Sequence, residues 1–222
     1  MSRPAIEVEQ LCKRYGAVLA VDDIAFAVPA GATNALLGGN GAGKTTTLSM
    51  LLGLLLPTSG LIRVLGVDMV NNRCAALPRM NFTSPYVDLP HRLTVGQNLD
   101  VYARLYGIRR RDARIRQLAE QFGLAGLLKR GYGSLSAGQR TRVSLAKSLL
   151  NEPEVLLMDE PTASLDPFTA EQVRSALQDY QRQTGATLLL ASHNMQEVER
   201  LCQQVLIMKQ GRIVDRGAPA AL

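Results

Sequence analysis

Short apolar runs alternate with longer segments of helical periodicity along the chain. Three of the apolar runs are nearly continuous, and each leads into a polar or glycine-rich turn; they span residues 33–37, 155–158 and 187–191. Strands that are apolar on both faces are typical of a parallel sheet that helices cover on both sides. The pattern therefore predicts an α/β protein built around a largely parallel sheet.

Shorter apolar segments near the two ends of the chain predict antiparallel pairing. Residues 5–8 and 24–28 are expected to form antiparallel strands, as are residues 205–209 and 212–215. A Gln-Gly pair separates the last two segments, which indicates a β-hairpin.

The middle of the chain has a different pattern. Residues 99–151 show helical periodicity, few β-branched residues and nine of the 20 arginines. We therefore expect a helical subdomain over about residues 86–150, inserted into a single domain that spans residues 1–222. The length is ordinary for one domain, and no internal repeat or linker divides the chain further.

Composition excludes several classes of protein. With 46% hydrophobic and 20% charged residues, the chain is expected to be globular rather than disordered, collagen-like or coiled-coil. The three cysteines have no C-x-x-C spacing, which argues against a disulfide framework or a zinc site and fits a reducing cytoplasm. No apolar run approaches the roughly 18 residues that cross a bilayer. Any membrane association is therefore expected to be peripheral.

A glycine-rich motif follows the first continuous apolar run. It matches G-x-x-x-x-G-K-[ST] between a predicted strand and a predicted helix, the context that a phosphate-binding loop requires. Lys44 would reach the β- and γ-phosphates of a nucleotide, and the Thr45 hydroxyl would ligate Mg²⁺. The alternative is a glycine-rich turn without this function. The predicted nucleotide-binding residues are Gly38, Gly39, Asn40, Gly41, Ala42, Gly43, Lys44, Thr45 and Thr46.

Two carboxylates end the second continuous run. Asp159 and Glu160 follow residues 155–158, so they are expected at the carboxyl edge of the sheet, beside the phosphate loop. There Asp159 can hold Mg²⁺ through water, and Glu160 can orient or deprotonate an attacking water. The alternative is that both acids cap the next helix, because Pro161 and Thr162 follow them.

Residues 135–139 (LSAGQ) open a predicted helix with Ser136 as its N-cap. Their place about 20 residues before Asp159 resembles the signature motif of ATP-binding-cassette (ABC) ATPases, which commonly reads LSGGQ. The phosphate loop, the signature, the Asp-Glu pair, residues 164–166 (Ser-Leu-Asp) and His193 occur in the order of that family, so the resemblance covers nearly the whole chain. It implies a P-loop NTPase (RecA-like) sheet core with an antiparallel β subdomain and the helical insertion.

The resemblance assigns roles to further residues. Tyr15 would stack on adenine, which is worth roughly 1 to 3 kcal/mol for a base; the alternative is a tyrosine in an antiparallel sheet. His193 would bond the γ-phosphate and fix the water near Glu160, although a lone histidine after a strand is usually structural. Asp166 would lie at the junction between two subunits. The signature would meet ATP bound to a second subunit through Ser136, Ala137, Gly138 and Gln139.

Three positions depart from the family pattern. Ala137 replaces the first glycine of LSGGQ, and Gly39 replaces a proline that is common in the phosphate loop. The family also has a Gln that contacts Mg²⁺ at the end of the strand after the phosphate-loop helix. Counting back from the LTV sequence at residues 93–95 places Ser84 or Pro85 there, and neither supplies an amide oxygen.

The resemblance implies a subunit that binds and hydrolyses ATP with Mg²⁺ and powers separate transmembrane permease subunits at the cytoplasmic face of the inner membrane. Two identical copies would form a head-to-tail dimer that closes two sites, and no nucleic acid is expected as a partner. Residues 93–111 resemble ATPase subunits of two-component exporters of lipids, polysaccharides or drugs. Two alternatives remain: a soluble ABC ATPase that acts on the ribosome or on DNA, and a regulatory subunit that binds nucleotide without hydrolysing it.

The net charge is concentrated in the helical part. The chain carries 25 Lys+Arg and 19 Asp+Glu, a net charge of +6. Residues 86–150 hold 12 of the basic and 4 of the acidic residues, so the rest of the chain is slightly acidic. The arginines of residues 104–116 either form a solvated helix face or meet an acidic partner loop or anionic lipid head groups.

Overall fold

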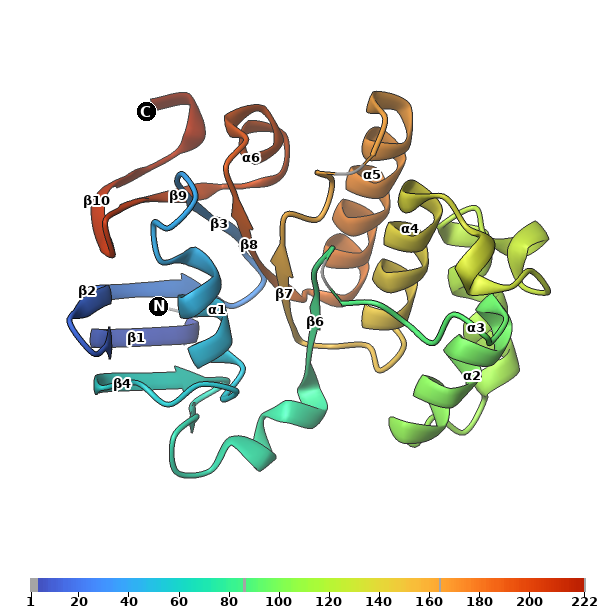
Figure 1. Ribbon diagram of the computed structural model, residues 1–222, viewed down its shortest axis with the longest axis horizontal. Coiled ribbons are helices and arrows are strands. Elements are labelled where there is room, and N and C mark those ends of the chain that lie inside the picture. Colours follow the sequence, from blue (N-terminus) through green and yellow to red (C-terminus); the bar gives the residue numbers. More distant parts are fainter. Residues whose placement is uncertain (1–3, 86, 164, 222) are drawn as a thin grey trace.

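Two β-sheets form the framework of the computed structural model, which describes residues 4–85, 87–163 and 165–221 (Figure 1). The larger sheet has the strand order β10-β9-β3-β8-β7-β6, and the smaller sheet has the order β2-β1-β4-β5. The strands are β1 Pro4–Tyr15, β2 Val18–Pro29, β3 Thr33–Leu37, β4 Ser59–Val64, β5 Val67–Asp68, β6 Met80–Thr83, β7 Val155–Asp159, β8 Thr187–Ser192, β9 Gln204–Lys209 and β10 Arg212–Gly217. The α-helices are α1 Lys44–Leu51, α2 Val95–Leu105, α3 Arg111–Gln121, α4 Ala137–Ser148, α5 Pro167–Thr184 and α6 Met195–Leu201.

The larger sheet confirms the predicted parallel core. β8 lies between β3 and β7 and is parallel to both; its register pairs Ser192 with Leu37 and Ala191 with Asp159. The carboxyl ends of the three strands therefore meet at one edge of the sheet, which is where open α/β sheets bind ligands. β9 and β10 pair in antiparallel fashion, which confirms the predicted hairpin.

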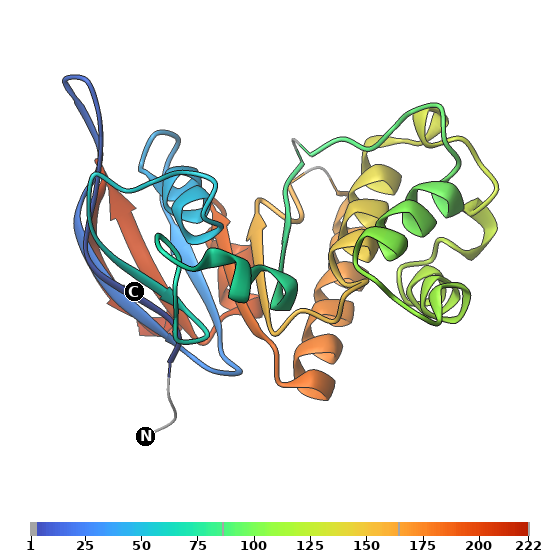
Figure 2. The ribbon, with the colours of Figure 1, turned by 90° about the horizontal axis from the view of Figure 1, so that it is seen from below.

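Alternate residues of the central strands point to opposite faces of the larger sheet. In β7, Leu156 and Met158 join one buried cluster, whereas Val155 and Leu157 join the other. α4 and α5 cover the first face, and α1 with the smaller sheet covers the second (Figures 1 and 2). Both faces are covered, which explains why these strands are apolar at nearly every position.

The predicted helical segment lies between β6 and β7, two strands that pair in parallel although Met80 and Val155 are far apart in the chain. It contains three separate helices, α2, α3 and α4: a turn over residues 106–110 divides the first two, and turns with short 3₁₀ segments over residues 122–136 divide the last two. A capping box begins α4 at Ser136, so the predicted N-cap is confirmed. Tyr86, the expected first residue of this part, lies outside the described residues.

The strand predictions need correction in the smaller sheet and at the edge of the larger one. β1 and β2 have 12 residues each and extend beyond the predicted apolar cores, because polar residues interrupt the apolar pattern at Glu9 and Gln10 in β1 and at Asp22 and Asp23 in β2. The apolar pattern does not predict β4, β5 or β6: β4 begins with Ser-Gly, and β6 reads Met-Asn-Phe-Thr. Pairing of β4 with β1 and of β6 with β7 makes these segments strands.

A lysine is buried where α4 packs against β6. Lys147 is 6% exposed, and its Nζ donates hydrogen bonds to the Phe82 carbonyl oxygen at 3.2 Å and to Asn81 Oδ1 at 3.4 Å. The ammonium group also lies 5.4 Å from the centroid of the Tyr102 ring. All three partners are neutral. Burial lowers the pKa of Lys147 to about 8, because the charged form loses its hydration.

We expect Lys147→Met to stabilise the protein at neutral pH, and this gain to shrink as the pH rises. The unfolded chain keeps the Lys147 proton up to the ordinary pKa of 10.5, whereas the folded chain loses it near 8. Between these two values the unfolded state binds more protons, so the wild type gains stability with rising pH, by an amount on the order of 3 kcal/mol.

Urea unfolding of the wild type and Lys147→Met across this pH range measures the effect. Lys129→Met, at an exposed position, is the matched control and should show no such dependence. A difference between wild type and Lys147→Met that stays constant with pH would contradict a buried ammonium.

Candidate functional site

The loop between β3 and α1 has glycines at two positions where a side chain does not fit. Gly43, which precedes α1, has φ of 103°, and a Cβ there would lie 2.7 Å from the Ala20 carbonyl oxygen. A Cβ on Gly38 would lie 2.3 Å from the Met208 carbonyl oxygen. The loop backbone therefore packs directly on β2 and β9. The predicted context of the motif, between a strand and a helix, is confirmed.

Lys44 is the first residue of α1, and its side chain folds back over the loop. Its Nζ donates hydrogen bonds to the carbonyl oxygens of Gly38 at 2.6 Å and of Gly39 at 3.1 Å. The residue is only 6% exposed, so the ammonium group is held at the loop rather than in solvent. A cation held beside the N-terminus of a helix is suited to bind phosphate.

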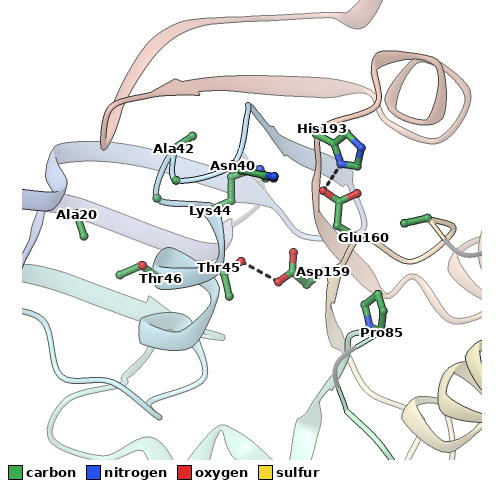
Figure 3. A pocket seen from close by; sticks show the side chains of 13 residues that line it. Ala20, Asn40, Ala42, Lys44, Thr45, Thr46, Pro85, Asp159, Glu160 and His193 are labelled. Atoms are coloured by element: carbon green, nitrogen blue, oxygen red, sulfur yellow. Dashed lines mark hydrogen bonds and ion pairs between the residues drawn. The ribbon is translucent and has the colours of Figure 1, made fainter.

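Thr45 and Asp159 place two side-chain oxygens beside the Lys44 ammonium group. Thr45 Oγ1 donates a hydrogen bond to Asp159 Oδ2 at 2.8 Å (Figure 3). Burial raises the pKa of Asp159, and the neighbouring Glu160 charge acts in the same direction. The described residues contain no group of three or more His, Cys, Asp or Glu that could hold a metal ion. A hydroxyl and a carboxylate fit Mg²⁺, which usually takes one or two protein oxygens and completes its shell with phosphate oxygens and water.

Glu160 pairs with a histidine from the neighbouring strand end. His193 Nδ1 lies 2.6 Å from Glu160 Oε1 (Figure 3). An ionised carboxylate only accepts hydrogen bonds, so Nδ1 is the donor. The Glu160 side chain is 15% exposed and that of His193 is 58% exposed. A carboxylate oriented in this way near a phosphate site can position or deprotonate a water molecule.

A cavity of about 530 Å³ brings these groups together at the carboxyl edge of the larger sheet. Its volume is in the range of small-molecule sites. It is lined by residues 40–46 of the loop, by Asp159, Glu160 and His193, and by Ala20, Pro85 and Ala163 (Figure 3). The sequence does not single out Ala20 or Ala163, because a small apolar residue at such a position has the same pattern as a core residue.

Asp159 and Glu160 do not cap the helix that follows them. α5 begins at Pro167, and its N-cap is Asp166, whose side chain accepts a hydrogen bond from the Thr169 N–H at 3.0 Å. The capping alternative is therefore wrong. Asp166 does not line the cavity, and its place at a subunit junction stays a prediction.

The signature residues lie away from the cavity of their own chain. Ser136 Oγ accepts a hydrogen bond from the Gln139 N–H, and Gln139 Oε1 accepts one from the Ser136 N–H. Ala137 lines a different cavity, on the other side of Pro85, and neither Ser136, Gly138 nor Gln139 lines the first one. The phosphate loop and the signature therefore do not meet within one chain.

Tyr15 also lies outside the cavity lining. It ends β1, is 49% exposed, and has Lys13 Nζ at 5.0 Å from its ring centroid. Ala20, from the adjoining β2, does line the cavity. The predicted stacking of Tyr15 on adenine stays a prediction, and Ser164, from the predicted Ser-Leu-Asp motif, lies outside the described residues.

The segment after β6 agrees with the count along the sequence. Of Ser84 and Pro85, the two residues that this count offers for the position of the family's Gln, Pro85 lines the cavity (Figure 3). The amides of Asn81 and Gln97 are engaged elsewhere: Asn81 Nδ2 donates to Asn151 Oδ1 at 2.7 Å, and Gln97 belongs to the capping box of α2. Neither amide reaches the cavity lining.

Comparison with known proteins identifies the family. The family model of the ABC transporter matches residues 21–163, which is more than half of the chain. The chain belongs to the ABC transporter family. Membership implies that it is an ATP-binding subunit with ATPase activity.

Two relatives show how far the similarity extends. The Nod factor export ATP-binding protein I of Paraburkholderia xenovorans is 39% identical over 228 residues, which cover 100% of this chain and 73% of that protein. The probable multidrug ABC transporter ATP-binding protein YbhF of Escherichia coli is 36% identical over 216 residues, covering 96% of this chain and 37% of that protein.

Solved structures of ABC ATPases have the same fold. An ATP-binding subunit of an ABC transporter matches with a TM-score of 0.88 at 28% identity, over 96% of this chain and 90% of that one. CbiO1 from Clostridium perfringens, part of the ABC transporter complex CbiONQ, matches with a TM-score of 0.85 at 29% identity, over 98% of this chain and 90% of that one. The predicted P-loop NTPase fold class is confirmed.

We expect Lys44→Ala to weaken ATP binding at least about tenfold, because a charge-assisted contact contributes roughly 1.5 to 3 kcal/mol. Equilibrium titration with a fluorescent ATP analogue and Mg²⁺ measures the affinity. Lys129→Ala removes an exposed lysine and should bind as the wild type does. Wild-type affinity in Lys44→Ala would contradict the role of this ammonium group.

Proposed function

We propose that this chain hydrolyses ATP between two copies of itself and thereby powers the permease of an exporter. The Glu160–His193 pair carries the proposal. It lines the same cavity as Lys44 and the Thr45–Asp159 pair, so a base for water stands next to a phosphate site.

Each residue around the cavity has a separate task in this mechanism. The loop backbone and Lys44 bind the phosphates of ATP. Thr45 and Asp159 would hold Mg²⁺, which when bound neutralises charge on the phosphates. Glu160 accepts the proton of the attacking water or orients it. His193 orients Glu160 through Nδ1–H. Its Nε2 accepts a hydrogen bond from the water in the neutral ring, and donates one to the γ-phosphate when the ring carries both protons.

A second copy of the chain would complete the site. The phosphate loop and the signature are both present once and lie on different parts of the chain. A two-fold axis would place the signature of each copy over the loop of the other and would close two sites together. Binding of ATP would hold the copies together, and loss of the γ-phosphate contact would release them.

The outer part of α2 is our proposed contact with the permease. Leu105 is 72% exposed and Val101 43% exposed, and Arg109 and Arg110 follow in the exposed turn before α3. Apolar side chains beside cations suit a peripheral contact at a membrane protein. None of the helices in the described ranges is long and apolar enough to cross a membrane.

Two observations favour this function over the alternatives. The relatives named for Nod factor export and multidrug transport match the whole chain or nearly all of it, which favours an exporter over an ATPase of the ribosome or of DNA. The intact Glu160–His193 pair favours hydrolysis over a purely regulatory role, even though the count along the sequence places Ser84 or Pro85 where the family has its Gln. Lipids, polysaccharides and drugs remain the proposed classes of substrate.

We expect Glu160→Gln to bind ATP but to lose turnover, because an amide cannot accept the proton of water. ATP would then persist at the interface and trap a dimer. Phosphate release and size-exclusion chromatography with and without ATP measure both effects. Glu199→Gln, at an exposed position of α6, is the control. Undiminished turnover in Glu160→Gln would refute the catalytic role.

We expect the combined change of Leu105→Ser, Arg109→Glu and Arg110→Glu to reduce recovery of the permease without affecting ATP binding. Affinity purification from detergent-solubilised membranes, followed by mass spectrometry, measures the recovery. Arg216→Glu on β10 controls for the change in charge. Equal recovery from both variants would contradict the proposed contact, and recovery of ribosomes or DNA alone would favour the alternative function.

A further inference from the structure

A buried carboxylate lies directly behind the Glu160–His193 pair. Glu197 of α6 is only 3% exposed. It accepts a hydrogen bond from Thr162 Oγ1 at 2.5 Å through Oε1, and another from Ser192 Oγ at 2.7 Å through Oε2. A buried carboxylate is costly unless hydrogen bonds satisfy its oxygens. Each oxygen of Glu197 therefore depends on one of these hydroxyls.

The two hydroxyls belong to the two loops that carry the pair. Thr162 stands two residues after Glu160, and Ser192 directly precedes His193. Glu197 thus bridges the loop after β7 and the loop after β8 through its two oxygens. Ser192 Oγ also accepts a hydrogen bond from the Asn194 N–H at 3.1 Å, so His193 lies between two residues that are held to this bridge.

The backbone of Glu160 needs such support. Its φ is 48°, in the left-handed region that costs a residue other than glycine roughly 1 to 2 kcal/mol. Strained residues of this kind persist only where the surrounding structure holds them. A hydrogen bond from the Glu160 N–H to the Ala191 carbonyl oxygen at 2.9 Å holds one side, and the Thr162 hydroxyl holds the chain just beyond it.

Packing alone does not hold the pair in place. A second cavity, of about 350 Å³, borders Glu160, Thr162, His193 and Glu197 on the side away from the phosphate loop. Glu160 and His193 therefore have open space on both sides, since each also lines the first cavity. Hydrogen bonds rather than close packing must fix their distance.

We propose that Glu197 is a positioning residue that joins the loops of Glu160 and His193 and keeps these two side chains at hydrogen-bonding distance. The effect on turnover rests on the proposed function, whereas the effect on the geometry of His193 does not. Glu197 joins the two loops only while both of its hydrogen bonds, from the Thr162 and Ser192 hydroxyls, are present. Loss of either hydroxyl therefore breaks the same connection between the loops.

Histidine NMR tests the geometry without ATP. The chain has two histidines, His91 and His193. In alkaline buffer the wild-type His193 should carry its proton on Nδ1, which donates to Glu160, and ¹⁵N shifts report this tautomer. Thr162→Val, Ser192→Ala and Glu197→Gln should each shift the His193 signals towards those of Glu160→Ala, in which the acceptor is absent. The His91 signals should stay unchanged as an internal reference.

A matched control separates positioning from a loss of stability. Thr184→Val also removes one threonine hydroxyl, but that hydroxyl donates to the Tyr180 carbonyl oxygen and accepts from the Ala186 N–H at the C-terminal end of α5, whereas Thr162 precedes the N-terminal end. This variant should keep the wild-type His193 spectrum. A wild-type His193 spectrum in both Thr162→Val and Ser192→Ala would overturn the proposal, whatever their thermal stability.

A double-mutant cycle measured on kcat tests whether Thr162 and Ser192 act through the same connection, Glu197. Thr162→Val and Ser192→Ala should each lower kcat at least about tenfold and leave the KM for ATP within about twofold, because residues that act as a unit show non-additive effects. The double variant should be no slower than the slower single variant. Losses that multiply would overturn the proposal. An active Glu160→Gln would instead refute the catalytic role of Glu160, and the NMR result would still decide the positioning role.

Discussion

The parallel register of β3, β8 and β7 is the constraint on which the site depends. Ser192 pairs with Leu37 and Ala191 with Asp159, so the loops that follow the three strands begin at the same level of the sheet. The Glu160 N–H extends this pairing by donating to the Ala191 carbonyl oxygen. A slip of one residue would turn each side chain to the other face and would separate the phosphate loop from its acids.

Different forces stabilise the sheet and its carboxyl edge. Buried apolar packing on both faces stabilises the sheet, and alternate residues such as Leu156 and Leu157 lie in separate buried clusters. At the edge, backbone and side-chain hydrogen bonds hold residues beside open cavities. This division leaves room for a ligand, but it requires each polar group to have a defined partner.

The arrangement of one chain is also the reason why we propose a second copy as its partner. Ser136 caps α4 and does not line the cavity that Lys44 lines, so in the proposed dimer each copy would supply one part of each site. Residues 86–150, between β6 and β7, hold 12 of the 25 basic residues but only 4 of the 19 acidic ones, and Leu105 is exposed there. The cavity lies at the carboxyl edge of the larger sheet, whereas the proposed permease contact lies in the helical segment. α4 and the segment that contains Pro85 join these two parts of the chain.

The sequence by itself determined the features that depend on neighbouring residues: the apolar central strands, the phosphate loop before α1, the N-cap at Ser136 and the β9–β10 hairpin. Only the tertiary structure decided that β4 and β6 are strands, and that Asp166 rather than Asp159 or Glu160 caps α5. It also distinguished Glu197, which in the sequence has the same appearance as the exposed Glu199. The physical reason is that local pattern reports propensity and polarity, whereas strand pairing and the burial of a carboxylate depend on partners that lie far away in the chain.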